Sequence, residues 1–152
     1  MQYFLDTSAL VKRYINEIGT AWVQTLHDPL AGHMRWLMQM TAVECIAAIF
    51  RRVRLGHISL ADAQNIRTRF RADFSSDYRI VDVTPLLVER AMDLAERFTL
   101  RGYDAAQLAA ADLVNTQFVA LQHAPITFVS ADTDLNTAAQ RLGLRVENPN
   151  TH

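Results

Sequence analysis

The sequence predicts an α/β fold in which a mostly parallel sheet of about five strands is flanked by helices. Short apolar runs of β type alternate along the chain with longer stretches of helical periodicity, which is typical of βαβ units. The chain has 152 residues, 50% of them hydrophobic, which is the size of one compact domain with its own core. We therefore expect a single domain over residues 1–152. The predicted strands are residues 2–5, 35–40, 79–83, 126–129 and 144–147.

Two short helices are predicted after the first strand. Apolar residues recur at the spacing of a helix face over residues 8–16 and again over residues 20–27. Gly19 separates the two segments. Asp28 and Pro29 end the second helix, because both residues favour a turn.

A helical hairpin is predicted between the second and third strands. Its helices span residues 41–55 and 59–74, and Gly56 begins the tight turn that joins them.

Three further helices follow the third strand. Thr84 supplies a cap and Pro85 a first-turn proline for a helix that runs to about residue 98. The other two are predicted over residues 104–122 and 134–142.

Composition narrows the class of protein. The formal net charge is -1, from 15 basic and 16 acidic residues, so binding of nucleic acid would need a local basic patch. Cys45 is the only cysteine, which excludes an internal disulfide and fits a reducing compartment. The sequence has neither a signal-peptide pattern nor the run of about 18 apolar residues that spans a bilayer. We expect a cytoplasmic protein without a membrane partner.

Four acidic residues lie near the starts of predicted helices. Asp6 ends the first strand, and Glu44 and Asp132 each follow a strand closely. Asp104 opens a helix. Because the carboxyl ends of parallel strands face one side of a sheet, the four acids would converge on one pocket. The structural alternative is that each acid only caps its helix, and Thr41 with Glu44 matches a capping box.

Convergence of these acids would require a cation. Two carboxylates about 4 Å apart repel by about 4 kcal/mol at an effective dielectric constant of about 20. Carboxylate oxygens completed by water suit Mg²⁺ or Mn²⁺, whereas zinc usually brings histidine or cysteine. The five histidines lie in predicted turns or at the terminus without ligand spacing, so we expect them to be solvated.

Four sequence blocks occur in order along the chain. They are LDTSALVKRY from Leu5, TAVECIAAI from Thr41, YDAAQLAAA from Tyr103 and FVSADTDLNTAAQRLGL from Phe128. Together they resemble the PIN-domain ribonucleases, and most closely the VapC-type toxins of bacterial toxin–antitoxin pairs. The resemblance implies a PIN-like three-layer fold with a protruding helical hairpin. It also implies an endoribonuclease that hydrolyses RNA phosphodiester bonds with Mg²⁺ or Mn²⁺.

The resemblance also implies roles for individual residues and partners. Four acids would be both metal ligands and catalytic residues, namely Asp6, Glu44, Asp104 and Asp132. Ser8 resembles the hydroxyl that orients the site by hydrogen bonding, and Asp134 is an alternative or accessory acid. The implied partners are an RNA substrate, a cognate VapB-like antitoxin and a second copy of the chain in a homodimer.

Positive charge for contact with RNA is predicted in the hairpin. One acid, Asp62, lies among six arginines there, namely Arg51, Arg52, Arg54, Arg67, Arg69 and Arg71. A solvated helix face is the equally good alternative. Lys12, Arg13 and Arg101 lie closer in sequence to the acids and are equal candidates for contact with the scissile phosphate.

Three other functions are alternatives to a ribonuclease. A phosphohydrolase of the haloacid-dehalogenase type needs a second aspartate two residues after the first, where this chain has Ser8. A receiver domain needs a late lysine at a strand end, and the only lysine is Lys12. The third alternative is a PIN-like module that binds RNA or a protein without cleaving RNA. The presence of all four acids argues against it.

Overall fold

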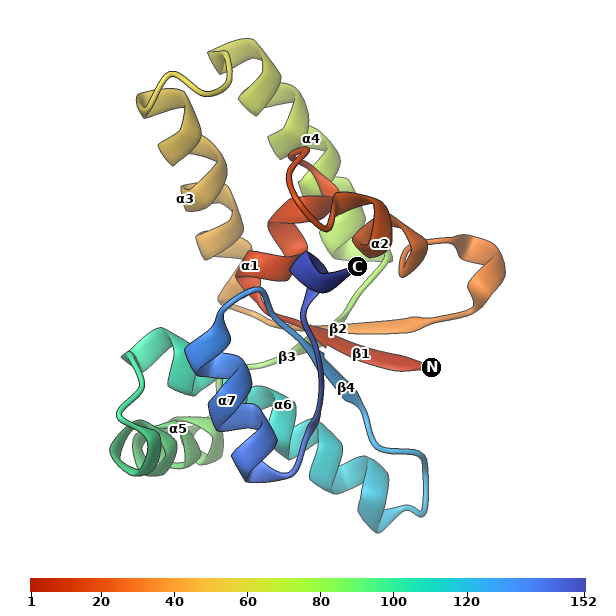
Figure 1. The fold of residues 1–152 in the computed structure, drawn as a ribbon, viewed down its shortest axis with the longest axis vertical. Coiled ribbons are helices and arrows are strands. Elements are labelled where there is room, and N and C mark those ends of the chain that lie inside the picture. Colours follow the sequence, from red (N-terminus) through yellow and green to blue (C-terminus); the bar gives the residue numbers. More distant parts are fainter.

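A single five-stranded sheet forms the centre of the computed structural model, which describes residues 1–152 (Figure 1). All four pairs of neighbouring strands are parallel, so the predicted α/β class is confirmed. The observed strands begin and end within two residues of the predicted limits. In the spatial order β3-β2-β1-β4-β5, they are β1 (Gln2–Leu5), β2 (Met34–Met38), β3 (Arg79–Val81), β4 (Thr127–Val129) and β5 (Arg145–Glu147).

Helices cover both faces of the sheet and complete the three layers (Figure 1). On one face lie α1 (Thr7–Leu10), α2 (Thr20–Thr25), α3 (Thr41–Arg54) and α4 (Leu60–Ser76). On the other lie α5 (Pro85–Phe98), α6 (Gly102–Ala120) and α7 (Thr133–Leu142). Short 3₁₀ turns occur at η1 (Val11–Arg13), η2 (Pro29–Ala31) and η3 (Pro149–Thr151). No helix combines the length and apolar character that crossing a bilayer would require.

The first helix is shorter than predicted. Residues 8–16 were expected to be helical, but α1 has four residues and tightens into η1. The Tyr14 amide donates to the Val11 carbonyl at 3.0 Å, which is the i to i+3 pattern of a 3₁₀ turn. The first α-helix therefore ends only a few residues after Asp6.

Alternating residues of β1 divide the core between the two faces of the sheet. Phe4 packs against residues of α5, α6 and α7 and stacks on Phe128 with ring centroids 6.0 Å apart. Tyr3 and Leu5 pack on the opposite face with residues of α1, α3 and α4. Each fully buried large side chain contributes about 1.5–3 kcal/mol of stabilisation, so both helical layers are held firmly against the sheet.

The order of strands reverses between β1 and β4. The chain runs from β1 outward to β2 and β3, and then returns to the other side of β1 to form β4 and β5. Open α/β sheets bind ligands outside the carboxyl ends of the strands at such a switch point. Asp6 directly follows β1, and Ser130 directly follows β4. The fold thus brings both residues to this crevice.

The predicted hairpin is also confirmed, and α3 with α4 projects from the body of the molecule (Figure 1). Gly56 closes α3 with a positive φ of 73°, which glycine adopts without steric cost. Ser59 caps α4 by accepting a hydrogen bond from the Asp62 amide at 3.0 Å.

Candidate active site

Asp6 lies at the carboxyl end of β1 and is only 5% exposed. Its Oδ1 accepts hydrogen bonds from the Ala9 amide at 3.0 Å and from the Ser8 hydroxyl at 2.7 Å. Its Oδ2 accepts from the Ser130 hydroxyl at 3.0 Å. Burial raises the pKa of Asp6 to about 6, against the lowering effect of these hydrogen bonds. Asp6 does cap α1, as the structural alternative proposed, but one of its oxygens is also held by a residue beyond a different strand.

Two serines connect the ends of β1 and β4. Ser8 Oγ donates to Asp6 and accepts from the Ala131 amide at 2.8 Å. Ser130 Oγ also donates to Asp6 and accepts from the Asp132 amide at 3.0 Å. Ser8 therefore has the orienting contact that the resemblance implied. Sequence reasoning missed Ser130, although a polar residue directly after an apolar strand was a usable signal.

Asp132 caps α7 through Oδ1, which accepts from the Leu135 amide at 2.9 Å. Its backbone is tied to Asp6 through the shared partner Ser130. Asp134 is exposed in the first turn of α7 and has no side-chain hydrogen bond or ion pair. The structure thus connects Asp132, and not Asp134, to the junction of β1 and β4.

Glu44 is held by two other elements instead of by its own helix. The capping box proposed for α3 is wrong, because Met40 occupies the cap position and makes no side-chain cap. Glu44 Oε2 accepts a short hydrogen bond from the Thr7 hydroxyl and a 3.3 Å bond from the Gln107 amide. Both bonds end on Oε2, which leaves Oε1 available. The capping alternative therefore fails for Glu44.

Gln107 is a functional candidate that sequence reasoning missed. It is 2% exposed, and its side-chain Nε2 lies 2.9 Å from Thr41 Oγ1 and 3.3 Å from both Glu44 Oε2 and Thr7 Oγ1. It follows Asp104 by three residues, which places the two side chains on one face of α6. An amide inside an alanine-rich buried helix was the available signal, since buried polar groups require partners.

Asp104 lies in the first turn of α6, because the helix begins at Gly102 and not at residue 104 as predicted. The cap position belongs to Arg101, so the capping alternative also fails for Asp104. Burial raises the pKa of Asp104, and the charge of Asp132 raises it further, while Arg101 lowers it. Burial likewise raises the pKa of Glu44, to which the charge of Asp104 adds. Asp104 is therefore near enough to Glu44 and to Asp132 for their charges to interact.

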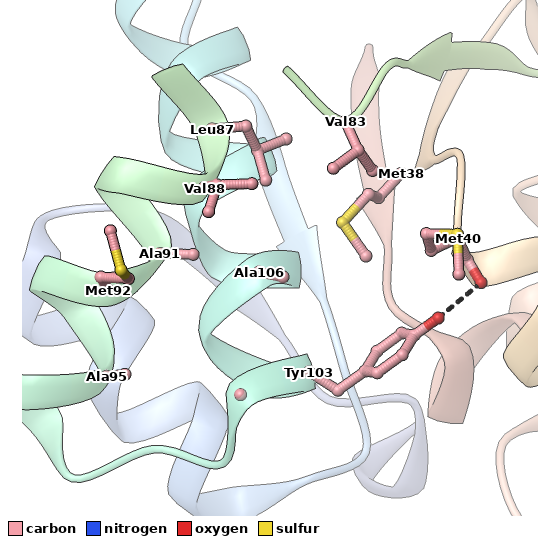
Figure 2. A pocket seen from close by; sticks show the side chains of 11 residues that line it. Met38, Met40, Val83, Leu87, Val88, Ala91, Met92, Ala95, Tyr103 and Ala106 are labelled. Carbon is pink, nitrogen blue, oxygen red and sulfur yellow. Dashed lines mark hydrogen bonds between the residues drawn. The ribbon is translucent and has the colours of Figure 1, made fainter. Parts of the chain in front are cut away.

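Tyr103 connects the helices that carry Glu44 and Asp104. Figure 2 shows its ring extending toward Met40, whose carbonyl oxygen accepts a hydrogen bond from the Tyr103 hydroxyl at 2.9 Å. Since Met40 directly precedes α3, this bond fixes the first turn of α6 beside the first turn of α3. Tyr103 also borders an apolar cavity of about 280 Å³ between α5, α6 and the end of β2.

The chemistry of these donors fits a hard divalent cation. Carboxylate oxygens are its preferred ligands, and burial together with neighbouring negative charge disfavours the ionised forms of Glu44 and Asp104. No three acidic, histidine or cysteine side chains lie close enough to form a ready group of metal ligands. The structure therefore couples Asp104 to Glu44 and Asp132, and joins Asp6 to Asp132 through Ser130, without drawing the four carboxylates into one compact cluster.

Two basic residues near Asp6 have structural contacts instead of facing the acids. Lys12 is 5% exposed, and its Nζ contacts Glu17 at 3.1 Å and the Ile18 carbonyl at 2.8 Å. Arg13 donates to Asp77 at 2.8 Å and to the Tyr78 hydroxyl at 2.6 Å. Both side chains are thus bound to groups within the chain.

His27 contacts the same Tyr78 hydroxyl as Arg13. The prediction that this histidine is solvated is wrong, because its ring is largely buried. Its Nδ1 lies 2.8 Å from the Val23 carbonyl and its Nε2 lies 3.0 Å from the Tyr78 hydroxyl. Burial lowers the pKa of His27 to about 3, so the ring is neutral and contributes to packing.

The sequence of this chain matches a known family, and its structure is similar to those of known proteins. The sequence model of the PIN domain matches residues 3–140. PAE2754 from Pyrobaculum aerophilum has a similar structure, with a TM-score of 0.64 and 18% identity, over 99% of this chain and 91% of that one. VapBC2 from Rickettsia felis, bound to a promoter DNA fragment, gives a TM-score of 0.65 at 14% identity over 97% and 98% of the two chains. FitAcB from Neisseria gonorrhoeae gives 0.64 at 16% identity over 97% of each. No curated protein matches the sequence.

Proposed function

This chain belongs to the PIN domain family, whose members are generally nucleases, and we propose that it is a metal-dependent endoribonuclease of a toxin–antitoxin pair. The observation that carries the proposal is the pairing of Glu44 with Asp104. Neither acid caps its helix. Burial disfavours the charge of both acids, and a neighbouring carboxylate adds to this effect, namely Asp104 for Glu44 and Asp132 for Asp104. Groups shifted in this way are typical of functional sites.

Asp6, Glu44 and Asp104 would hold Mg²⁺ or Mn²⁺, with Asp132 as the fourth acid. When bound, such an ion supplies an acidified water and stabilisation of charge on the phosphate and the leaving oxygen. Binding of the ion would draw these carboxylates together, because no three of them form a ready ligand group in the structure.

The remaining residues orient these acids. Ser8 and Ser130 hold the two oxygens of Asp6. Because Oδ1 also accepts from the Ala9 amide, the free lone pair of this carboxylate lies on Oδ2. Thr7 and Gln107 hold Oε2 of Glu44, so that Oε1 can face the substrate. Asp132 is exposed and is suited to accept a proton from an attacking water.

The proposed partners follow from the family and from similar structures. The structures from R. felis and N. gonorrhoeae are described as VapBC2 and FitAcB. These names support a cognate VapB-like antitoxin for this chain, and we extend the proposal to a homodimer that acts on RNA in the cytoplasm.

A second function is favoured by one observation. Because no compact group of three metal-binding side chains exists in the structure, a PIN-like module that binds RNA or protein without cleavage is the alternative. Metal-dependent cleavage separates the two functions.

Incubation of the purified protein with total RNA tests the proposal directly. We expect cleavage with Mg²⁺ or Mn²⁺, none with EDTA, and none by Asp6→Asn at unchanged circular dichroism. Cleavage by Asp6→Asn at the wild-type rate would reject the assignment, and intact RNA in every reaction would favour the binding module.

A further inference from the structure

A groove leads from Glu44 along α3 into the projecting hairpin. Its cavity has a volume of about 570 Å³ and is lined by Thr7 and by residues of α3, chiefly Glu44, Ala47, Ala48, Arg51 and Arg54. The spacing of these α3 residues is that of one helix face. A second cavity of about 310 Å³ shares Ala48 and Arg51 and extends to His57 at the turn of the hairpin. Together the two cavities extend along α3 from Glu44 to the turn of the hairpin.

The two ends of this groove carry opposite charge. Arg51 and Arg54 are exposed, and neither forms an ion pair with any acid of the chain. Arg52, by contrast, is neutralised by Glu17. Ala47, Ala48 and Phe50 supply the apolar part of the lining of this cavity.

Distance along α3 determines what these arginines can reach. At about 1.5 Å of rise per residue, Arg51 lies about 10 Å and Arg54 about 15 Å along the helix axis from Glu44. A phosphate placed at the acids therefore lies about two to three turns of helix from the backbone of these arginines. A strand that continues along the groove would present its next phosphates to both arginines.

We propose that this groove binds the sugar–phosphate backbone of single-stranded RNA beside the scissile bond, with Arg51 and Arg54 contacting phosphates further along the strand. The inference rests on the proposed function and adds the path of the substrate. A cavity of this size accommodates a ligand of drug-like dimensions, which is comparable to a short stretch of one strand. Of the six hairpin arginines, the structure assigns the contact to these two.

The groove makes affinity depend on the length of the substrate. A dinucleotide occupies only the acidic end, whereas a longer single strand also reaches the arginines. Phosphate contacts release counterions, so each contact on a single strand contributes about 0.7 to the slope of log affinity against log salt concentration.

The test compares two double variants that remove the same charge. Arg51→Gln with Arg54→Gln removes the arginines of the groove, and Arg67→Gln with Arg71→Gln removes two from α4 that do not line it. Binding of a fluorescent single-stranded oligoribonucleotide is measured in EDTA across a range of salt concentrations. We expect the slope to fall by about 1.4 for the groove variant and to keep its wild-type value for the α4 variant.

Cleavage in Mg²⁺ supplies an independent readout. The ratio of kcat/KM on the longer strand to kcat/KM on a dinucleotide is expected to fall toward one in the groove variant and to stay at the wild-type value in the α4 variant. An unchanged slope, or an equal fall in both variants, overturns the assignment of the groove.

Failure of the groove and failure of the proposed function give different results. A reduced slope without any metal-dependent cleavage supports the groove and rejects the nuclease. Metal-dependent cleavage with an unchanged slope supports the nuclease and rejects the groove. If the groove variant loses affinity for a polyglutamate peptide and keeps its affinity for RNA, the groove binds an acidic protein instead, and the proposal is wrong.

Discussion

The side-chain amide of Gln107 donates a hydrogen bond to Glu44 Oε2 at 3.3 Å, across 63 positions of sequence. The same amide lies 2.9 Å from Thr41 Oγ1, so one buried group joins α6 to the first turn of α3. Gln107 is thus a positioning residue that determines where Glu44 stands relative to Asp104.

Replacing Gln107 tests separately its effect on the position of Glu44 and its effect on the stability of the fold. Gln107→Leu leaves the buried Thr41 hydroxyl without a partner and should lower the free energy of unfolding by about 1–3 kcal/mol. Adding Thr41→Val removes the unpaired hydroxyl and should recover most of that loss, whereas RNA cleavage stays reduced because Glu44 remains unheld. Urea denaturation and cleavage assays measure the two effects. Recovery of cleavage together with stability would show that Gln107 has only a structural role.

A matched pair of variants distinguishes the acids at the start of α7. Asp132→Asn keeps a capping side chain but removes the carboxylate proposed to accept a proton from the attacking water, so cleavage should fall strongly with little change in stability. Asp134→Asn removes the same charge two residues away, where no contact is made, and should leave cleavage unchanged. Equal loss of cleavage in both variants would contradict the assignment of Asp132.

The buried carboxyl of Asp6 predicts a pH dependence of stability in protein freed of metal by EDTA. Its pKa is raised from 3.8 to about 6 in the folded state, so the folded state favours the protonated form. This contribution is fully present below pH 3.8 and is lost as the pH rises through about 6, with a magnitude of at most about 3 kcal/mol. The difference in unfolding free energy between wild type and Asp6→Asn should therefore change across this interval. A difference that is independent of pH would contradict the raised pKa.

Local patterns were sufficient to predict the framework of the fold. Apolar runs located all five strands, although only the central strands β1 and β4 are mostly buried, and Gly56 marked the turn of the hairpin. The first helix was predicted to be longer than it is, because its spacing pattern does not reveal the 3₁₀ turn at Val11. Fold class thus followed from periodicity, whereas the ends of elements depended on local hydrogen bonds.

The site was predictable in its acids but not in the residues that hold them. Glu44 matched a capping box in sequence, and only tertiary structure shows that Thr7 and Gln107 bind it instead. Lys12 and Arg13 were candidates because of their position near Asp6, yet both are bound within the structure. Which side chains meet across distant segments depends on the packed fold, and local sequence carries little of that information.

Titration of Mn²⁺ into protein freed of metal, followed by isothermal calorimetry, tests most directly whether the separated acids act together on a cation. We predict saturable binding to the wild type that is lost in Asp104→Asn, because Asp104 is coupled to both Glu44 and Asp132. Absence of binding to the wild type, or equal binding to both proteins, would contradict the account.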